Sequence, residues 1–320
     1  MKRLDRCALG IMLIVALPAL AQSYPSKPIR LVLPYPPGGG TDVIARPLAQ
    51  KLTEQLGQQV IVDNRGGAGG NIGMEFVAKS PADGYTLLFA LTAQYAVNPS
   101  LYPKLPYDPV RDYAPISLLA NAPYLLVVHP ALPAKSVAEL VALVKARPGQ
   151  LSYSSSGNGS GAHLAGEMLR SLARVEIVHV PYKGAGPAMP DLIAGQVQLS
   201  FITYTAAGPH IKTGRLRALG VTTAKRSPTL PDLPAIGETV AGYDSAVWYG
   251  FAAPAGTPLE IVSKLNAEVL RVLAAPDFRS RITLEAVSPI GSTPEEFGSF
   301  MKSEIVRWAK VVKDSGAKVD

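Results

Sequence analysis

The chain has 320 residues, of which 48% are hydrophobic, and a formal net charge of +7. This length suits about two domains, each with a sizeable core. The Lys and Arg residues are dispersed, which excludes nucleic acid as an expected partner because phosphate affinity needs clustered cations. The only cysteine is Cys7. It precedes the predicted mature chain, so that chain would have no disulfide, thiolate metal site or cysteine nucleophile.

The first 21 residues have the features of a secretory signal peptide. Lys2, Arg3 and Arg6 form a basic start, and residues 8–21 form an uncharged, mainly apolar run that ends in Ala-Leu-Ala. The alternative is an uncleaved membrane anchor, but the run is shorter than the ~20 apolar residues that span a bilayer. We therefore expect export to the periplasm and cleavage after residue 21.

Short β-branched runs alternate with segments of helical period through most of the chain. Strands are predicted at 29–35, 59–64, 85–91, 123–130, 151–156, 176–182, 197–203 and 215–223. Helices are predicted at 41–56, after the cap residue Ser136, at about 162–172, and from the end of the strand at 176–182 to about residue 194. This alternation indicates βαβ units and a largely parallel sheet, which is the α/β fold class.

The last part of the chain is predominantly helical. Segments 258–274 and 294–313 each follow a Thr-Pro-x-Glu pattern that starts at Thr257 or Thr293. The pattern predicts a capping box, in which Thr caps the helix and Glu bonds back to the cap residue. We assign both helices to structure and not to chemistry.

Three glycine-rich loops, 36–42, 64–71 and 154–163, lie between a predicted strand and a predicted helix. Open parallel sheets bind ligands beyond the carboxyl ends of their strands, and glycine lets the backbone approach a ligand closely. The helix that follows offers unpaired N–H groups and a positive dipole end, which together favour an anion such as a carboxylate. The alternative is that each loop is only a tight connection. Asp42 would repel an anion, so we interpret it as a helix cap.

The third loop also allows two enzymatic interpretations. Residues 157–162 fit G-x-G-x-x-A, with Glu176 about 20 residues further on, as in a dinucleotide site. However, the loop is rich in Gly and Ser throughout, and an exported protein meets little NAD. Ser160 lacks the flanking glycines of a hydrolase nucleophile elbow. We expect no cofactor.

Histidine and aromatic residues give weaker signals. The four histidines are too scattered for metal-ligand spacing, so no metal is expected. His163 opens the helix after the third loop, where it either donates to a carboxylate or simply caps and packs. Trp248 and Tyr249 are interpreted mainly as core residues.

Together with their surroundings, the loops form a series of motifs in a fixed order. These are YPSKPIRLVLPYPPGGGTD (24–42), VIVDNRGGAGGNIG (60–73), SPADGYTLL (80–88), NPSLY (98–102), YSSSGNGSGAHLAGEM (153–168), VPYKGAGPAMPDLIAGQV (180–197), RALGVTTAKRSPTLPDLP (217–234) and WYGFAAPAGTP (248–258). Across residues 24–320 the chain resembles the Bug-type receptors, the extracytoplasmic solute-binding proteins of tripartite tricarboxylate transporters.

The resemblance implies a periplasmic-binding-protein type II-like fold, with two α/β lobes and a ligand cleft between them. Lobe one would comprise 24–122 and 248–320, and lobe two 123–247, so the chain would cross between lobes near Pro123 and Val247. The lobes would close over the ligand by a hinge motion.

The resemblance also implies a ligand site between the first and third loops, made partly of backbone N–H groups. The predicted ligand-binding residues are Tyr35, Gly38, Gly39, Thr41, Thr92, Gly157, Asn158, Gly159, Ser160, His163, Lys183 and Thr203. Many relatives have an Asp near the end of the strand at 197–203, where our alignment places Ile202. Its absence argues against an amino-acid ligand and favours a plain or aromatic carboxylic acid.

We therefore expect a monomeric receptor and not an enzyme. Its partners would be a small organic carboxylate (a di- or tricarboxylate or an aromatic acid) and the membrane subunits of a transporter. Two alternatives stay open at this point: a secreted hydrolase on the same lobed fold, and a ligand-sensing subunit of a signalling system.

Overall fold

The computed structural model describes residues 24–38 and 40–319. The predicted signal peptide and Gly39 lie outside the described residues. Within the described ranges, no helix is long and apolar enough to cross a membrane.

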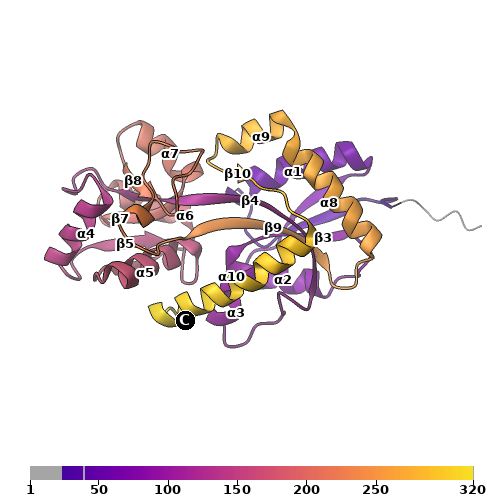
Figure 1. The fold of residues 1–320 in the computed structure, drawn as a ribbon, viewed down its shortest axis with the longest axis horizontal. Helices are drawn as coiled ribbons and strands as arrows, with labels where there is room; N and C mark the ends of the chain where they lie inside the picture. Colours follow the sequence, from indigo (N-terminus) through magenta and orange to yellow (C-terminus); the bar gives the residue numbers. More distant parts are fainter. Residues whose placement is uncertain (1–23, 39, 320) are drawn as a thin grey trace, which may run out of the picture.

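The chain alternates strands and helices for most of its length (Figure 1). The strands are β1 (Ile29–Leu33), β2 (Val60–Asn64), β3 (Thr86–Leu91), β4 (Tyr113–Val128), β5 (Ser152–Ser155), β6 (Val178–Pro181), β7 (Leu199–Thr203), β8 (Arg217–Val221), β9 (Ala246–Pro254) and β10 (Ser288–Pro289). The helices are α1 (Gly40–Leu56), α2 (Asn71–Ala78), α3 (Asn98–Leu101), α4 (Val137–Ala146), α5 (Gly161–Ala173), α6 (Ala185–Ile193), α7 (Tyr204–Lys212), α8 (Leu259–Ala274), α9 (Pro276–Thr283) and α10 (Pro294–Ser315).

The strands join in the order β2-β1-β3-β9-β4-β7-β5-β6, with β8 and β10 also paired to β4. β4 changes partners along its length. Residues up to Pro123 pair with β9, and residues from Tyr124 onward pair with β7 and β8. In Figure 1, β4 and β9 run between a group around α4–α7 and a group around α1, α2 and α8. The division into two lobes at these positions stays a prediction.

The prediction of a largely parallel sheet is only partly right. β1, β2 and β3 are mutually parallel, as are β5, β6 and β7. In contrast, β9 is antiparallel to β3 and β4, and β4 is antiparallel to β7 and β8. The 16-residue strand β4 runs much longer than the predicted strand 123–130 because it pairs with different strands along its two halves.

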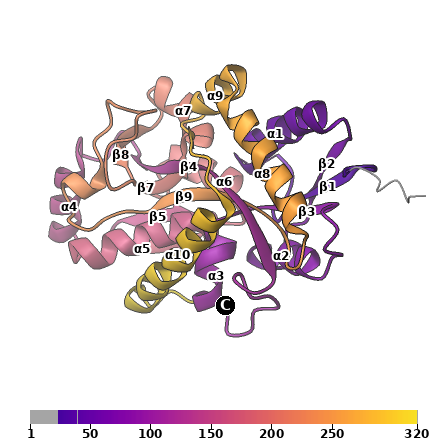
Figure 2. The ribbon, with the colours of Figure 1, turned by 45° about the vertical axis from the view of Figure 1, so that its right-hand side comes forward.

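Three clusters of buried apolar side chains hold these elements together. One packs α1 and α8 against one face of β1, β3 and β9. A second packs α6 and α7 against β4 and β7. The third contains α2, α5 and α10 with aromatic residues of β9 and the segment 93–97. α10 lies beside both α3 and α5, as Figure 2 shows.

Local capping follows the sequence in two cases and departs from it in one. Ser136 accepts the N–H of Glu139 at the start of α4, and Thr293 with Glu296 forms the predicted capping box of α10. The box predicted at Thr257 is wrong. The Thr257 hydroxyl instead donates to the carbonyl of Pro254, 2.7 Å away, and α8 begins one residue later than predicted. Helices α7 and α9 were not predicted.

Candidate functional site

The first glycine loop connects β1 to α1 and is held by side chains from α1 and β2. The N–H of Gly38 donates to Asp42 Oδ2 at 2.9 Å. Asn64 at the end of β2 donates to the carbonyl of Tyr35 at 3.1 Å. Asp42 is buried and forms an ion pair with Arg46 at 2.7 Å. Asp42 therefore fixes the start of α1, which agrees with the structural role predicted for it.

The second loop is tied to the first through Gln94, a fully buried residue that the sequence did not single out. Gln94 Oε1 accepts the Tyr35 hydroxyl at 2.9 Å, and its Nε2 donates to the carbonyl of Gly69 at 2.8 Å. Asn98 also donates to Gly69, and to Asn71 Oδ1 at 2.7 Å. The second loop thus serves to support Tyr35.

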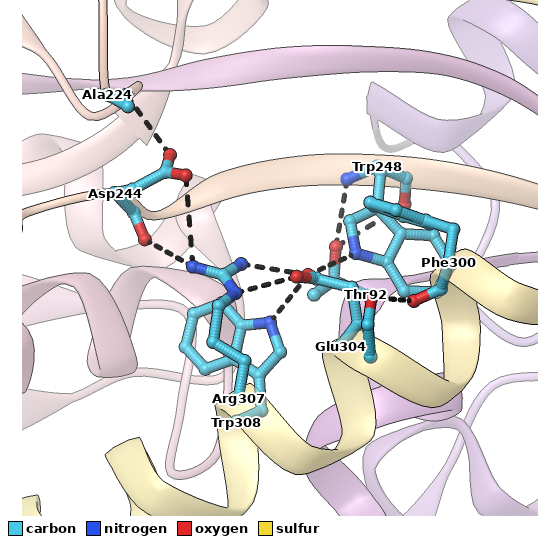
Figure 3. Close-up of polar contacts among 9 residues, drawn as sticks. Thr92, Ala224, Asp244, Trp248, Phe300, Glu304, Arg307 and Trp308 are labelled. Carbon is cyan, nitrogen blue, oxygen red and sulfur yellow. Dashed lines mark hydrogen bonds and ion pairs between the residues drawn. The ribbon is translucent and has the colours of Figure 1, made fainter.

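The side chain of Thr92, which directly follows β3, is hydrogen-bonded to the backbone of β9 (Figure 3). Its Oγ1 accepts the N–H of Trp248 at 2.8 Å and faces the carbonyl of the same residue at 3.5 Å. The indole of Trp248 stacks on Tyr95 and is buried, as expected for a core residue. Thr92 is therefore a support for β9.

The third loop connects β5 to α5, and several of its N–H groups are bonded within it. Ser160 donates its N–H to the carbonyl of Gly157 at 3.1 Å. Gly157 donates to Ser155 Oγ at 3.1 Å, and Gly159 donates to His163 Nδ1 at 3.0 Å. Ser160 caps α5 by accepting the N–H of His163. Any ligand of this loop must therefore use its remaining polar groups or displace these bonds.

His163 lies beneath the loop. Its ring is 5% exposed and stacks on the ring of His179, with centroids 4.0 Å apart. Burial lowers the pKa of His163 below its usual range, and it lowers that of His179 to about 4, with the neighbouring His163 adding to the effect. Both rings are therefore neutral near pH 7. In this structure the Nδ1 of His163 accepts the N–H of Gly159 and the ring packs on His179, while its role toward a ligand stays a prediction.

Three tyrosines connect the first and third loops. Tyr124, where β4 changes partners, and Tyr249 on β9 both lie close enough to Tyr35 for its hydroxyl to add to the rise in their pKa that burial causes. A Cβ placed on Gly161, the first residue of α5, would lie 2.5 Å from the Tyr124 hydroxyl oxygen. Tyr35 in the first loop and Tyr124 beside the start of α5 therefore lie in one cluster with Tyr249.

Sequence reasoning missed Tyr124 and treated Tyr249 as core. Within the part of the chain that the structure describes, neither hydroxyl forms a hydrogen bond, whereas the Tyr35 hydroxyl donates to Gln94. The one available signal was the position of both residues beside the predicted crossings near Pro123 and Val247. Thr203 lies directly opposite Tyr124 in the β4–β7 ladder.

Two other positions that the sequence singled out differ in their burial. Lys183 is exposed between β6 and α6. Ile202 is buried in the core formed with α6 and α7, opposite Leu125. An acidic side chain at position 202 would enter that core, so Ile202 gives no information about the ligand. Across the described residues, no cluster of three His, Cys, Asp or Glu side chains is placed to hold a metal ion.

Comparison with known proteins gives consistent results. Residues 44–317 match the family described as the tripartite tricarboxylate transporter family receptor. Protein BugT of Bordetella pertussis is 40% identical over 309 residues, covering 95% of this chain and 94% of BugT. The structure of R. palustris Rpa4515 with adipate has a TM-score of 0.86 and 40% identity, and covers 92% of this chain and all of that one. MatC of Rhodopseudomonas palustris with bound malate has a TM-score of 0.80 and 32% identity, over 90% of this chain and all of that one.

Proposed function

This chain belongs to the tripartite tricarboxylate transporter receptor family, and from that premise we propose that it captures a small organic carboxylate in the periplasm. The receptor would then deliver this ligand to the membrane subunits of its transporter. Receptors of this kind bind and release their ligand without changing it.

The observation that carries this proposal is the tyrosine cluster, in which Tyr35 precedes the start of α1 and Tyr124 lies against the start of α5. The first N–H groups of each helix have no carbonyl partner within the helix, and the dipole places partial positive charge there. Tyrosine hydroxyls can donate to carboxylate oxygens as well. This arrangement supports the binding of an anion by neutral donors.

Ligand-binding residues follow from this arrangement. The proposed set keeps every position predicted from the sequence and adds the two tyrosines found in the structure. Tyr124, Tyr249 and Thr203 would offer hydroxyl groups, and Gly39, Thr41, Asn158 and Ser160 would offer loop or helix-start donors. Gly38 would shape the first loop through its bond to Asp42. Gly157, Gly159 and His163 would shape the third loop, Lys183 would offer a positive charge, and Tyr35 and Thr92 would fix the walls.

The ligand class comes from the relatives. A relative of 40% identity was solved with adipate and one of 32% identity with malate, and both ligands are dicarboxylates. Small dicarboxylates are therefore the first ligands to test, with tricarboxylates and aromatic acids next.

A thermal-shift screen tests the proposal. The mature chain is unfolded and refolded to remove any bound ligand, then melted with adipate, malate, citrate, benzoate, amino acids, sugars or NAD. A ligand at 100 times its Kd should add about 2.7 kcal/mol of stability. A shift confined to carboxylates supports the proposal, and recovery of the ligand unchanged separates a receptor from a hydrolase. Shifts only with sugars or NAD would overturn it.

A matched pair of variants at Gly40 tests the site. Gly40 opens α1, has no positive φ, and a Cβ there meets nothing within 4 Å, so both Ala and Asp fit. Gly40→Asp adds a negative charge at the helix start and should weaken carboxylate binding at least about tenfold, which is ~1.4 kcal/mol. Gly40→Ala should leave affinity nearly unchanged. Equal affinity in the two variants would place the ligand elsewhere.

A further inference from the structure

The shape of the third loop depends on one nitrogen atom. The N–H of Gly159 points inward and donates to His163 Nδ1 at 3.0 Å, while the N–H of His163 itself donates to Ser160 Oγ at 3.2 Å. Gly159 has a φ of +74°, which glycine adopts readily. The imidazole ring therefore closes the loop from below.

This hydrogen bond requires a particular protonation state. Nδ1 accepts a hydrogen bond only when it carries no proton, and both nitrogens of an imidazolium are donors. A protonated His163 would set two N–H groups against each other at 3.0 Å. The His179 ring, stacked at 4.0 Å, would be held against the new charge.

The groups around His163 act on its charge in opposite directions. Burial disfavours the protonated ring most, and Arg170 acts in the same direction. Glu167 favours protonation, but this carboxylate is already paired with Arg170 at 2.6 Å and accepts the Tyr153 hydroxyl at 2.8 Å. His179 bonds to Ser155 Oγ through Nε2 at 2.6 Å, which joins β6 to the same loop.

We propose that His163 is a positioning residue that holds the β5–α5 loop in its ligand-binding conformation only while its ring is neutral. Protonation releases Gly159, the loop loses its shape, and carboxylate affinity falls in acid. The expected loss of carboxylate affinity rests on the proposed function. The coupling between His163 and Gly159 does not, because it is a property of the ligand-free protein.

The first experiment needs no ligand. The amide resonance of Gly159 is followed by NMR in the ¹⁵N-labelled mature chain from about pH 8 to about pH 4. The range extends below that of an unperturbed histidine because burial lowers the pKa of His163. In the wild type the resonance should move or broaden in step with His163 protonation. In His163→Asn, whose side-chain oxygen can accept the same N–H without titrating, it should stay constant. A wild-type resonance that does not respond, or one that responds equally in the Asn variant, would overturn the proposal.

The second experiment measures the consequence with adipate as the probe. The ratio of Kd values for wild type and His163→Asn, taken at each pH, cancels the titration of adipate itself. We expect this ratio to rise toward acid by at most about tenfold per pH unit, the limit for one linked proton. His163→Ala should bind weakly at every pH, and His163→Asn should restore binding. A flat ratio would overturn the role in binding. Failure of adipate to bind at any pH, with the NMR coupling present, would count against the ligand class alone.

Discussion

Glu304 on α10 accepts the indole N–H of Trp248 on β9, with Oε2 2.8 Å from Nε1 (Figure 3). The same carboxylate accepts the indole N–H of Trp308 at 3.1 Å and two N–H groups of Arg307. Arg307 in turn donates to the carbonyl of Asp244, two residues before β9 begins. A single buried carboxylate therefore ties the last helix to the strand that carries Tyr249.

Glu304→Ala should be strongly destabilising. It removes the acceptor of two indole N–H groups and leaves the partly buried Arg307 without its carboxylate partner. Removing one partner of a buried ion pair costs about 3–5 kcal/mol of stability. Glu304→Gln keeps an acceptor and should cost less. Urea unfolding of both variants measures the difference.

Asp244→Asn is the matched control for that prediction. Its carboxylate lies 4.0 Å from Arg307 and its side chain is 44% exposed, so the ion pair contributes little, within about 1 kcal/mol. The N–H of Ala224 can still donate to the amide oxygen. A loss as large as that of Glu304→Ala would show that Asp244, and not Glu304, anchors α10.

Gln94→Met should destabilise the protein more than Tyr35→Phe. Tyr35→Phe removes one hydrogen bond, worth about 1 kcal/mol. Gln94→Met fills a similar volume but leaves the Tyr35 hydroxyl and the Leu91 N–H without their partner, and leaves the Gly69 carbonyl with Asn98 alone. The cycle formed by both variants, measured by denaturant unfolding, should show a coupling of about 0.5–3 kcal/mol. Additive losses would mean that the first two loops are independent.

Gly159→Ala should destabilise the third loop for two reasons that can be separated. The backbone there has a φ of +74°, and an added Cβ would overlap Leu101 Cδ2 on α3. A Gly159→Asp variant would therefore lose binding even without charge repulsion, which makes it a poor test of anion binding.

The two causes separate in the Leu101→Ala background. That change removes the overlapping methyl groups, so Gly159→Ala should then cost only its backbone strain, about 1 kcal/mol. Thermal unfolding of the four proteins measures the cycle. An unchanged cost in both backgrounds would assign the whole effect to the backbone.

Stability should fall as the pH falls from about 6.5 to about 4. Burial lowers the pKa of His179 to about 4 in the folded protein, whereas an unfolded histidine titrates near ~6.5. Between these values the unfolded chain binds more protons, so acid favours unfolding by at most ~1.4 kcal/mol per pH unit for this group. His179→Gln keeps a polar partner for Ser155 and should flatten the dependence of the unfolding free energy on pH. An identical slope in wild type and variant would assign the acid sensitivity to other groups.

The sequence by itself determined the local features of this protein. The β-branched runs located eight of the strands, β1 to β8, only approximately, but the loops at β1–α1, β2–α2 and β5–α5 fell between strand and helix as predicted. The capping box at Thr293 formed because all its groups lie within four residues. The ordered motifs identified the family, since their residues follow one another along the chain.

Only the tertiary structure decided how those pieces meet. Thr257 lost its predicted cap because a carbonyl three residues earlier, on β9, took its hydroxyl. The antiparallel course of β4 and β9 depends on pairing between residues more than 100 positions apart, as between Ala122 and Val247. The same long-range pairing brings Tyr124 and Tyr249 to Tyr35. Periodicity reports which face of an element is apolar, but it does not report which distant element will cover that face, so the centre of the candidate site came from the fold.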